Sequence, residues 1–299
     1  MTQLDQIGEI VSWTAPSKVD YNDLVLAING AGLCDSMAPE MRPVNAFKRA
    51  IQEMKDGRVI RQCEEDEDRI AFQFTAETLA KGEYEYTTEC FVSVAKSDGV
   101  CTSQDAALAQ LAEDKLNEKV GQRTASDVTR MIQSLFKRNG DIFSVREAGG
   151  CYFVPQAHVN LCEKVEEVLD MIGGSIRRFE IGATKNATKS AAQAVKEQLD
   201  DLVTEFGSYL EMLKSDSPQQ VTAATKKIAI VKAKAETYKE LLGDYAESFK
   251  VAIGEMNSDL MDKLGVEPSE VPPPVAEVAA EEPSVSDILA DLIAQTQSI

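Results

Sequence analysis

The sequence predicts an α+β protein with a long helical hairpin, because its apolar residues follow two different periods. Between residues 58 and 95 apolar and polar residues alternate, as in antiparallel strands with one face on a core. From Thr188 to Leu264 apolar residues recur every three or four positions, the spacing of helices that pack along a seam. A chain of 299 residues, 43% of them hydrophobic, is long enough to form two folded parts.

The α+β domain is expected over residues 20–182, after an N-terminal segment of residues 1–19. Short helical pieces begin it, and an amphipathic helix starts at Pro43, where the missing N–H of proline costs nothing. A meander of three strands follows, with Glu64–Asp68 in its first turn. The remaining expected elements are helices over 103–120 and 125–138, a β-hairpin over 142–154, a helix over 157–172 and a returning strand over 175–181.

The hairpin over residues 188–264 is expected to be an antiparallel coiled coil. The connector that ends at Pro218 is short, which suits two helices that fold back on one another. The apolar seam that would face the partner helix, or a second copy of the chain, consists of Leu199, Leu202, Phe206, Ile228, Val231, Tyr238, Leu242 and Phe249.

The second helix of this hairpin is expected to be much longer than the first. Residues after Tyr245 would have no partner in the first helix, although the apolar stripe continues to Leu264. At about 1.5 Å per residue this overhang is roughly 30 Å long. We expect it to pack on the globular part or on another subunit, and we favour oligomerisation slightly over packing within one chain.

The net charge of −19 is concentrated in two places. Glu64–Asp68 contributes five negative charges, and residues 265–299 contribute seven with no Lys or Arg. Since the rest of the chain is only mildly acidic, the total charge does not exclude nucleic acid as a partner.

The residues that usually support catalysis are scarce. His158 is the only histidine, so no Ser-His-Asp site and no multi-histidine metal site is expected. We read it as a solvent-side or capping residue at a helix start. A carboxylate-only metal site is the alternative that remains open. We therefore expect no enzymatic activity and no cofactor, with a carboxylate-based enzyme as the minority interpretation.

The sequence also bears on where the protein acts. The six cysteines are scattered singly, as expected of thiols in a reducing cytoplasm. The sequence contains neither a recognisable signal peptide nor a run of about 18 apolar residues. We therefore expect a cytoplasmic protein that does not enter a membrane.

A basic helix suggests nucleic-acid binding as the main alternative function. Two helices, a short turn and a β-hairpin occur in the order of a winged helix-turn-helix. The second helix is basic within an acidic chain, and basic side chains can neutralise phosphates. The alternative interpretation is that the polar face of this helix is only solvated and forms ordinary salt bridges to Glu113 or Glu118. The candidate face for duplex DNA consists of Arg123, Arg130, Gln133, Lys137, Arg138 and Arg146.

The C-terminal end is expected to be a tethered docking element. Residues 265–283 form a linker rich in Pro, Ala, Val and Glu, which we expect to be disordered. Residues 284–299 are expected to form a short amphipathic helix that docks in a groove of another protein or folds back on its own domain. The apolar face of that helix consists of Ile288, Leu289, Leu292 and Ile293.

The stretch Gly149-Gly-Cys-Tyr-Phe-Val-Pro155, with a helix on each side, resembles an uncharacterised family associated with bacteria and their phages. That family continues into a long α-hairpin with an element similar to Tyr238-Lys-Glu-Leu-Leu-Gly243. The resemblance covers about residues 40–250 and implies no activity, cofactor or site residue.

Taken together, these features predict a non-enzymatic interaction or scaffolding protein in the cytoplasm, or in the host cytoplasm if a phage or mobile element encodes it. It would oligomerise through the helical hairpin and dock a partner protein with its tail. The alternative is a winged-helix DNA-binding protein.

Overall fold

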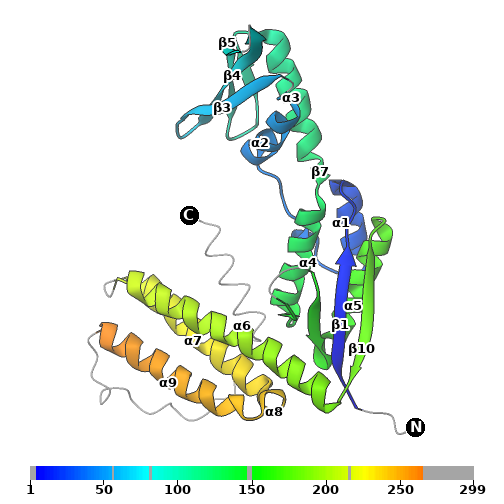
Figure 1. Ribbon diagram of the computed structural model, residues 1–299, viewed down its shortest axis with the longest axis vertical. Coiled ribbons are helices and arrows are strands. Elements are labelled where there is room, and N and C mark those ends of the chain that lie inside the picture. The colour runs from blue at the N-terminus through cyan, green and yellow to red at the C-terminus, as the bar shows by residue number, and fades with distance from the viewer. Residues whose placement is uncertain (1–4, 56, 81–82, 147–149, 215–216, 265–299) are drawn as a thin grey trace. The chain divides into compact units, whose positions relative to one another are not determined.

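The computed structural model describes residues 5–55, 57–80, 83–146, 150–214 and 217–264 (Figure 1). Its fold is mixed α/β with antiparallel sheets, as predicted. The expected linker over 265–283 and tail helix over 284–299 lie outside the described residues. The chain forms two compact units from separate stretches of sequence. Unit 1 contains Met1–Thr14, Ile132–Glu166 and Ser175–Ile299, and unit 2 contains Ala15–Met131 and Glu167–Gly174.

Unit 1 contains a four-stranded sheet that begins with a strand the sequence did not predict. Its strands, in the order β10-β1-β9-β8, are Ser175–Gly182, Gln6–Thr14, Tyr152–Pro155 and Phe143–Ser144. The expected hairpin and returning strand are therefore confirmed, and β1 joins them. In β1, a Cβ on Gly8 would lie 2.2 Å from the carbonyl oxygen of Val154, so only glycine fits there.

The two faces of this sheet have different chemistry. On one face Phe143 and Phe153 join the apolar cluster of the helical bundle. The other face carries the buried carboxylate of Glu9, which accepts two hydrogen bonds from the Arg178 guanidinium at 2.8 and 2.9 Å. Arg178 also donates to Glu166 in the middle of α5 (Val159–Met171), and these bonds raise the pKa of Arg178. A buried carboxylate is thus fully paired within the fold.

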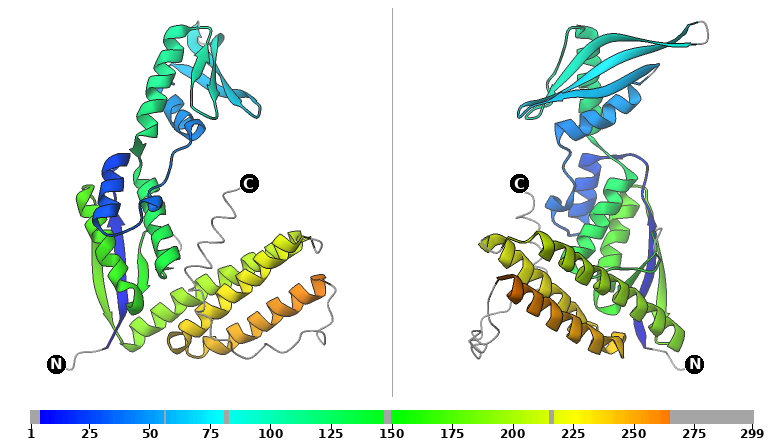
Figure 2. Two further views of the ribbon diagram at one scale, coloured as in Figure 1. Left: turned by 180° about the vertical axis from the view of Figure 1, so that it is seen from behind. Right: turned by 60° about the vertical axis from the view of Figure 1, so that its left-hand side comes forward.

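The helical region of unit 1 is a bundle of three long helices and a short one. They are α6 (Lys185–Met212), α7 (Pro218–Thr237), α8 (Lys239–Leu242) and α9 (Tyr245–Leu264). Figure 2 shows α6, α7 and α9 side by side. The predicted reversal between residues 213 and 217 is confirmed, but the prediction of one continuous second helix is wrong.

Gly243 gives the physical reason for this correction. Its φ of +54° is a backbone conformation that residues other than glycine rarely adopt. Gly243 ends α8. The chain then turns, with the Ala246 N–H bonded to the Gly243 carbonyl, and α9 runs back along α6 and α7. The overhang expected after Tyr245 therefore does not exist, because Phe249, Met256 and Leu260 are buried in the same bundle.

The predicted seam residues all belong to this cluster. Leu202 is partly buried, and the other seven are buried: Leu199, Phe206, Ile228, Val231, Tyr238, Leu242 and Phe249. A single chain thus covers the stripe from which we expected oligomerisation.

Unit 2 contains the predicted meander with one short strand added. The sheet order is β3-β4-β5-β6, with β3 at Arg58–Glu65, β4 at Arg69–Ala80, β5 at Glu83–Ala95 and β6 at Cys101–Ser103. Its inner face packs against α2 (Pro43–Glu53) and α3 (Ala106–Val120). The predicted helix that starts at Pro43 is therefore confirmed, and Phe47, Phe72 and Phe74 lie at the centre of this core.

The rest of unit 2 leads into helix α4. It contains α1 (Tyr21–Gly30) and a two-stranded pair of β2 (Val19–Asp20) with β7 (Gln122–Arg123). Immediately after β7, α4 (Ala125–Asn139) begins, and residues 125–131 of α4 belong to unit 2. The Asp20 carboxylate accepts hydrogen bonds from Asn22 and Asp23, which caps the start of α1.

Candidate functional site

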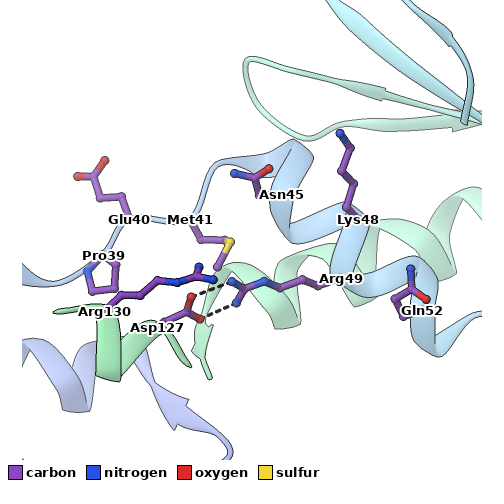
Figure 3. Close-up of a pocket in the computed structure, with 9 residues that line it drawn as sticks. All are labelled: Pro39, Glu40, Met41, Asn45, Lys48, Arg49, Gln52, Asp127 and Arg130. Atoms are coloured by element: carbon purple, nitrogen blue, oxygen red, sulfur yellow. Dashed lines mark hydrogen bonds and ion pairs between the residues drawn. The ribbon is translucent and has the colours of Figure 1, made fainter. Parts of the chain in front are cut away.

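A polar cavity lies in unit 2, between α2 and the start of α4 (Figure 3). Its volume is about 540 Å³, and it is open to solvent. Three cationic side chains, Lys48, Arg49 and Arg130, line it together with two carboxylates, Glu40 and Asp127. The lining therefore has an excess of positive charge within a strongly acidic chain.

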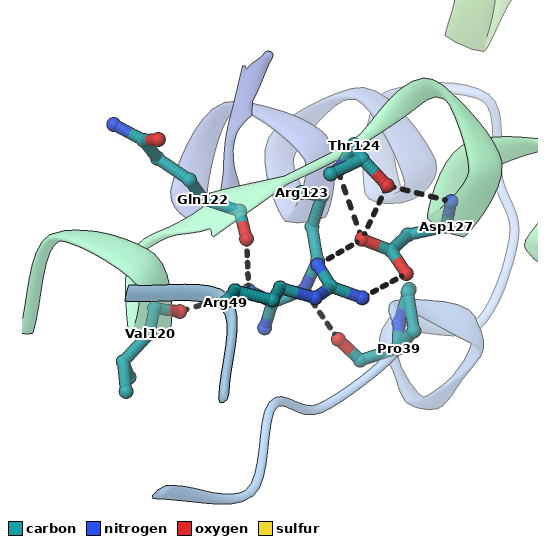
Figure 4. A network of polar contacts seen from close by, with 7 residues as sticks. All are labelled: Pro39, Arg49, Val120, Gln122, Arg123, Thr124 and Asp127. Atoms are coloured by element: carbon teal, nitrogen blue, oxygen red, sulfur yellow. Dashed lines mark hydrogen bonds and ion pairs between the residues drawn. The ribbon is translucent and has the colours of Figure 1, made fainter. Parts of the chain in front are cut away.

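An ion pair between Arg49 of α2 and Asp127 of α4 forms part of the lining of this cavity. Arg49 donates to both oxygens of Asp127, at 2.6 and 2.8 Å, and Asp127 also accepts from the N–H and hydroxyl of Thr124 (Figure 4). These hydrogen bonds lower the pKa of the buried Asp127 carboxyl against the opposing effect of burial. Since its lone pairs are occupied by Arg49 and Thr124, Asp127 is a structural anion rather than a base available to a substrate.

Arg123 lies beside this pair and is buried, with 2% of its surface exposed. Its guanidinium donates to the carbonyl oxygens of Pro39, Val120 and Gln122 (Figure 4). The guanidinium carbon also lies over the Tyr21 ring, 4.3 Å from its centre. A side chain bound in this way cannot reach a phosphate. This burial could not be predicted from the sequence, because Arg123 occurs in a run of polar residues.

The other residues of the candidate DNA face lie in several different environments. Arg130 is exposed at the unit 2 cavity. In unit 1, the Gln133 amide donates to the Tyr152 hydroxyl at 2.7 Å, Lys137 and Arg146 are exposed, and Arg138 is half-buried. The candidate residues are thus divided between the two units.

The arrangement expected of a winged helix is not observed. The apolar residues of α3 pack in a cluster formed by α2, α3 and the sheet of unit 2. Strands β8 and β9 are part of the larger sheet of unit 1, where β9 pairs with β1, so they do not form a separate wing. The α3 cluster and the β8–β9 pair thus belong to different units.

A second polar cluster, in unit 1, was missed at the sequence level. Asp141 forms an ion pair with Lys234 of α7 and accepts a hydrogen bond of 2.6 Å from the Tyr238 hydroxyl. The same hydroxyl lies 3.4 Å from Nε2 of His158, which is half-buried rather than on the solvent side. Burial lowers the pKa of His158 and raises that of Tyr238. This cluster fastens α7 to the loop before β8.

Other nucleophiles and metal ligands do not form a reactive site in the described residues. Among the described residues, Cys63, Cys90, Cys101, Cys151 and Cys162 form no disulfide. Burial raises the pKa of the Cys101 and Cys162 thiols to about 12, so both stay protonated at neutral pH. In the part of the chain that the structure describes, no group of three or more His, Cys, Asp or Glu residues is arranged to hold a metal ion.

The most exposed apolar surface of unit 2 is the distal half of the β4–β5 hairpin, which we name the ribbon (residues 77–80 and 83–91). Residues that face one another across an antiparallel pair lie on the same face of the sheet. Leu79 pairs with Tyr84, and Glu77 pairs with Tyr86, on the face opposite the core. The large apolar side chains on this face are Leu79, Tyr84, Tyr86 and Phe91, which are 66%, 61%, 59% and 45% exposed.

The ribbon projects beyond its neighbouring strands (Figure 2, right). On one side, the pairing of β3 with β4 ends at Ala76. On the other side, β6 pairs only with Val92–Val94, so within the described residues no strand lies along Glu83–Phe91. The ribbon therefore combines an uncovered apolar face with an open backbone edge.

The fold thus defines a mixed α/β protein with three polar networks that stabilise its own structure and an exposed β-ribbon. By sequence, the chain belongs to a family of unknown function (DUF6744), whose profile matches residues 6–269. No curated protein and no solved structure matches it. Among the described residues, no helix is both long and apolar enough to cross a membrane.

Proposed function

We propose that this protein acts by binding another protein and not by catalysis, and that the ribbon of unit 2 is the contact surface. The observation that supports this proposal is the row of exposed apolar side chains on one face of the ribbon. Large apolar side chains that gather on one exposed face mark interaction sites more often than scattered ones do. Tyrosine is also enriched in protein–protein interfaces, since it adds contact area together with a polar hydroxyl.

The polar networks support a binding protein rather than an enzyme. Asp127, Asp141 and Glu9 each have their oxygens occupied by donors of the same chain. Their function is to hold helices and strands together. The ribbon, in contrast, contains side chains that contribute nothing to the core on which it rests.

Photo-crosslinking tests this proposal. A benzoylphenylalanine in place of Tyr86 should give discrete adducts with a partner protein when the chain is expressed in its natural host. The matched control places the same group at Val251, which is 58% exposed on α9. Equal adduct patterns at Tyr86 and Val251 would contradict a contact surface on the ribbon.

Duplex DNA is a second candidate partner, favoured by the excess of cations at the unit 2 cavity. Arg130 and Lys137 are the exposed basic residues of α4 that would contact phosphates. Binding should weaken as salt rises and should weaken further in the double variant Arg130→Ala, Lys137→Ala. Equal affinity of the double variant and the wild type would remove this candidate.

Three finer features complete the proposal. The bundle of unit 1 would act as a scaffold and would bring copies of the chain together through its outer surface, since its seam is covered within one chain. The tail, with Leu289 and Leu292 on its apolar face, would dock a second protein. A cytoplasmic location, in a host cell if a phage encodes the chain, is supported by five cysteines that form no disulfide among the described residues (Cys63, Cys90, Cys101, Cys151 and Cys162) and by the resemblance to a family of bacteria and phages.

A further inference from the structure

We propose that the open edge of β5 in the ribbon binds an extended segment of a partner protein in which cationic and apolar side chains alternate. This inference rests on the proposed function and names the chemistry of the partner. Three features of the ribbon support it: an unpaired backbone edge, an aromatic face and an acidic face.

The backbone edge fits a strand. An extended peptide can add to an exposed sheet edge through main-chain hydrogen bonds, with pockets or surfaces for alternate side chains. β5 offers such an edge along Glu83–Phe91, and every residue from Glu83 to Glu89 is exposed. On the other side, β3 pairs with β4 up to Ala76, and the Glu77 N–H donates to the Gly57 carbonyl at 3.1 Å, so fewer backbone groups are open there. The edge of β5 is therefore the longer open edge of the ribbon.

The two faces of β5 require different side chains from an added strand. Tyr84 and Tyr86 lie on the outer face, whereas Glu83 and Glu85 alternate with them and point to the other face. Residues of an added strand that lie on the outer face would contact the two rings and gain from apolar character. Residues on the other face would meet the two carboxylates, where Lys or Arg is favourable.

The charges of the ribbon also argue against two other occupants. In a second copy of the chain, β5 would place its own Glu83 and Glu85 beside these carboxylates, and like charges on neighbouring strands repel. The C-terminal residues 265–299 carry seven acidic residues and no Lys or Arg. A cationic partner strand is the occupant that complements the ribbon.

Labelled peptides test the inference on the full chain by fluorescence anisotropy. The first probe is Lys-Thr-Lys-Val-Lys-Tyr-Lys, the second carries Glu at each Lys, and the third repeats the first with alternate backbone nitrogens methylated. We expect the lysine probe to bind and the other two to bind at least about tenfold more weakly, since charge and edge hydrogen bonds are lost.

Variants of the chain locate the binding. The double variant Glu83→Gln, Glu85→Gln should weaken the lysine probe about tenfold, because each opposite-charge pair contributes modestly. The matched control, Glu64→Gln with Glu67→Gln, removes the same charge from the other end of this sheet and should leave binding unchanged. Tyr84→Ala with Tyr86→Ala should remove binding, and all these positions are exposed, so folding is retained.

The outcomes separate the two proposals. Failure of the lysine probe to bind, equal binding of the glutamate probe, or equal effects of the two Glu→Gln pairs would overturn the cationic partner. Adducts between two copies of the chain at position 86 would overturn it in favour of self-pairing. If Tyr86 still gives partner adducts in any of these cases, the proposed function stands; if it gives none, both proposals fail.

Discussion

The α9 helix of unit 1 and the ribbon of unit 2 both display apolar rows, but only one of these rows is covered. In α9, Phe249, Met256 and Leu260 are 2%, 3% and 5% exposed, because α6 and α7 lie against them. In the ribbon, Tyr84 and Tyr86 are 61% and 59% exposed, because the core of unit 2 lies on the other face of the sheet.

This difference shows that a row of apolar residues in the sequence predicts that something covers the row. It does not show whether the same chain or a partner protein covers it. In unit 1 the chain supplies the contact itself, through a turn at Gly243. In unit 2 the described residues supply none at the ribbon. We therefore expect a partner protein to bind at the uncovered row. We expect the covered row to contribute to the free energy of unfolding.

The largest effect should come from truncating the covered row. Replacing Phe249 by Ala should lower the free energy of unfolding by about 3–5 kcal/mol, because it removes buried contacts and leaves a cavity. Urea unfolding of the purified variant measures this loss. Val251→Ala on the same helix is the control and should change stability by less than about 0.5 kcal/mol. Equal effects of the two substitutions would mean that α9 is not packed as described.

In unit 2, the buried group that we compare with Phe249 is the polar side chain of Asp127. Asp127→Asn should cost about 2–3 kcal/mol, because hydrogen bonds to a charged group are lost at Arg49 and Thr124. The folded state holds the pKa of Asp127 below its ordinary value of 3.8, so the stabilisation is present above that pH and is lost as the pH falls further. Urea unfolding across this range measures both effects. Arg130→Gln, in the same cavity, should change little, and a loss as large as that of Asp127→Asn would contradict this view.

A smaller effect should follow from the pH dependence of unit 1. Burial lowers the pKa of His158, so the folded state keeps this side chain neutral while the unfolded chain takes up a proton near pH 6.5. Stability should therefore fall as the pH drops through 6.5 and should be insensitive to this group above it. Because His158 is the only histidine, the variant His158→Gln should show a flatter dependence between about pH 5.5 and 7.5. An unchanged slope would contradict the assignment.

The smallest effect on stability should come from the uncovered row. Tyr84→Ala with Tyr86→Ala should shift the free energy of unfolding by no more than about 0.5 kcal/mol, since both rings are mostly exposed. Thermal and urea unfolding measure this shift. A loss of several kcal/mol would show that the ribbon face contributes to the core and would weaken its role as a contact surface.

Local patterns predicted most elements of this fold. The helix that starts at Pro43, the β meander and the reversal before Pro218 follow from period and turn residues, and the structure confirms them. The strand β1 was missed, because Gly8 interrupts its alternation and its partners β9 and β10 lie far along the chain. Gly243 was missed as a turn, because the apolar period continues across it when a third helix joins the same core.

The site residues were harder to predict for a related reason. Arg123 has the sequence context of a phosphate contact, yet carbonyl oxygens from Pro39 and Val120 enclose it. The cluster of Asp141, His158 and Lys234 joins positions that are distant in sequence. The ribbon was recognised as strand, but its exposure depends on where β3 and β6 end, which local patterns do not determine.

The most direct test of the contrast between the two rows is side-chain footprinting with a photochemical carbene, read by mass spectrometry. Because of their exposure, we expect strong labelling of Tyr84 and Tyr86 and weak labelling of Phe249 and Met256 in the isolated chain. When the lysine probe is added, we expect labelling to fall at these two tyrosines and at neither Phe249 nor Met256. Strong labelling of Phe249 and Met256, or weak labelling of Tyr84 and Tyr86 before any partner is added, would contradict this contrast.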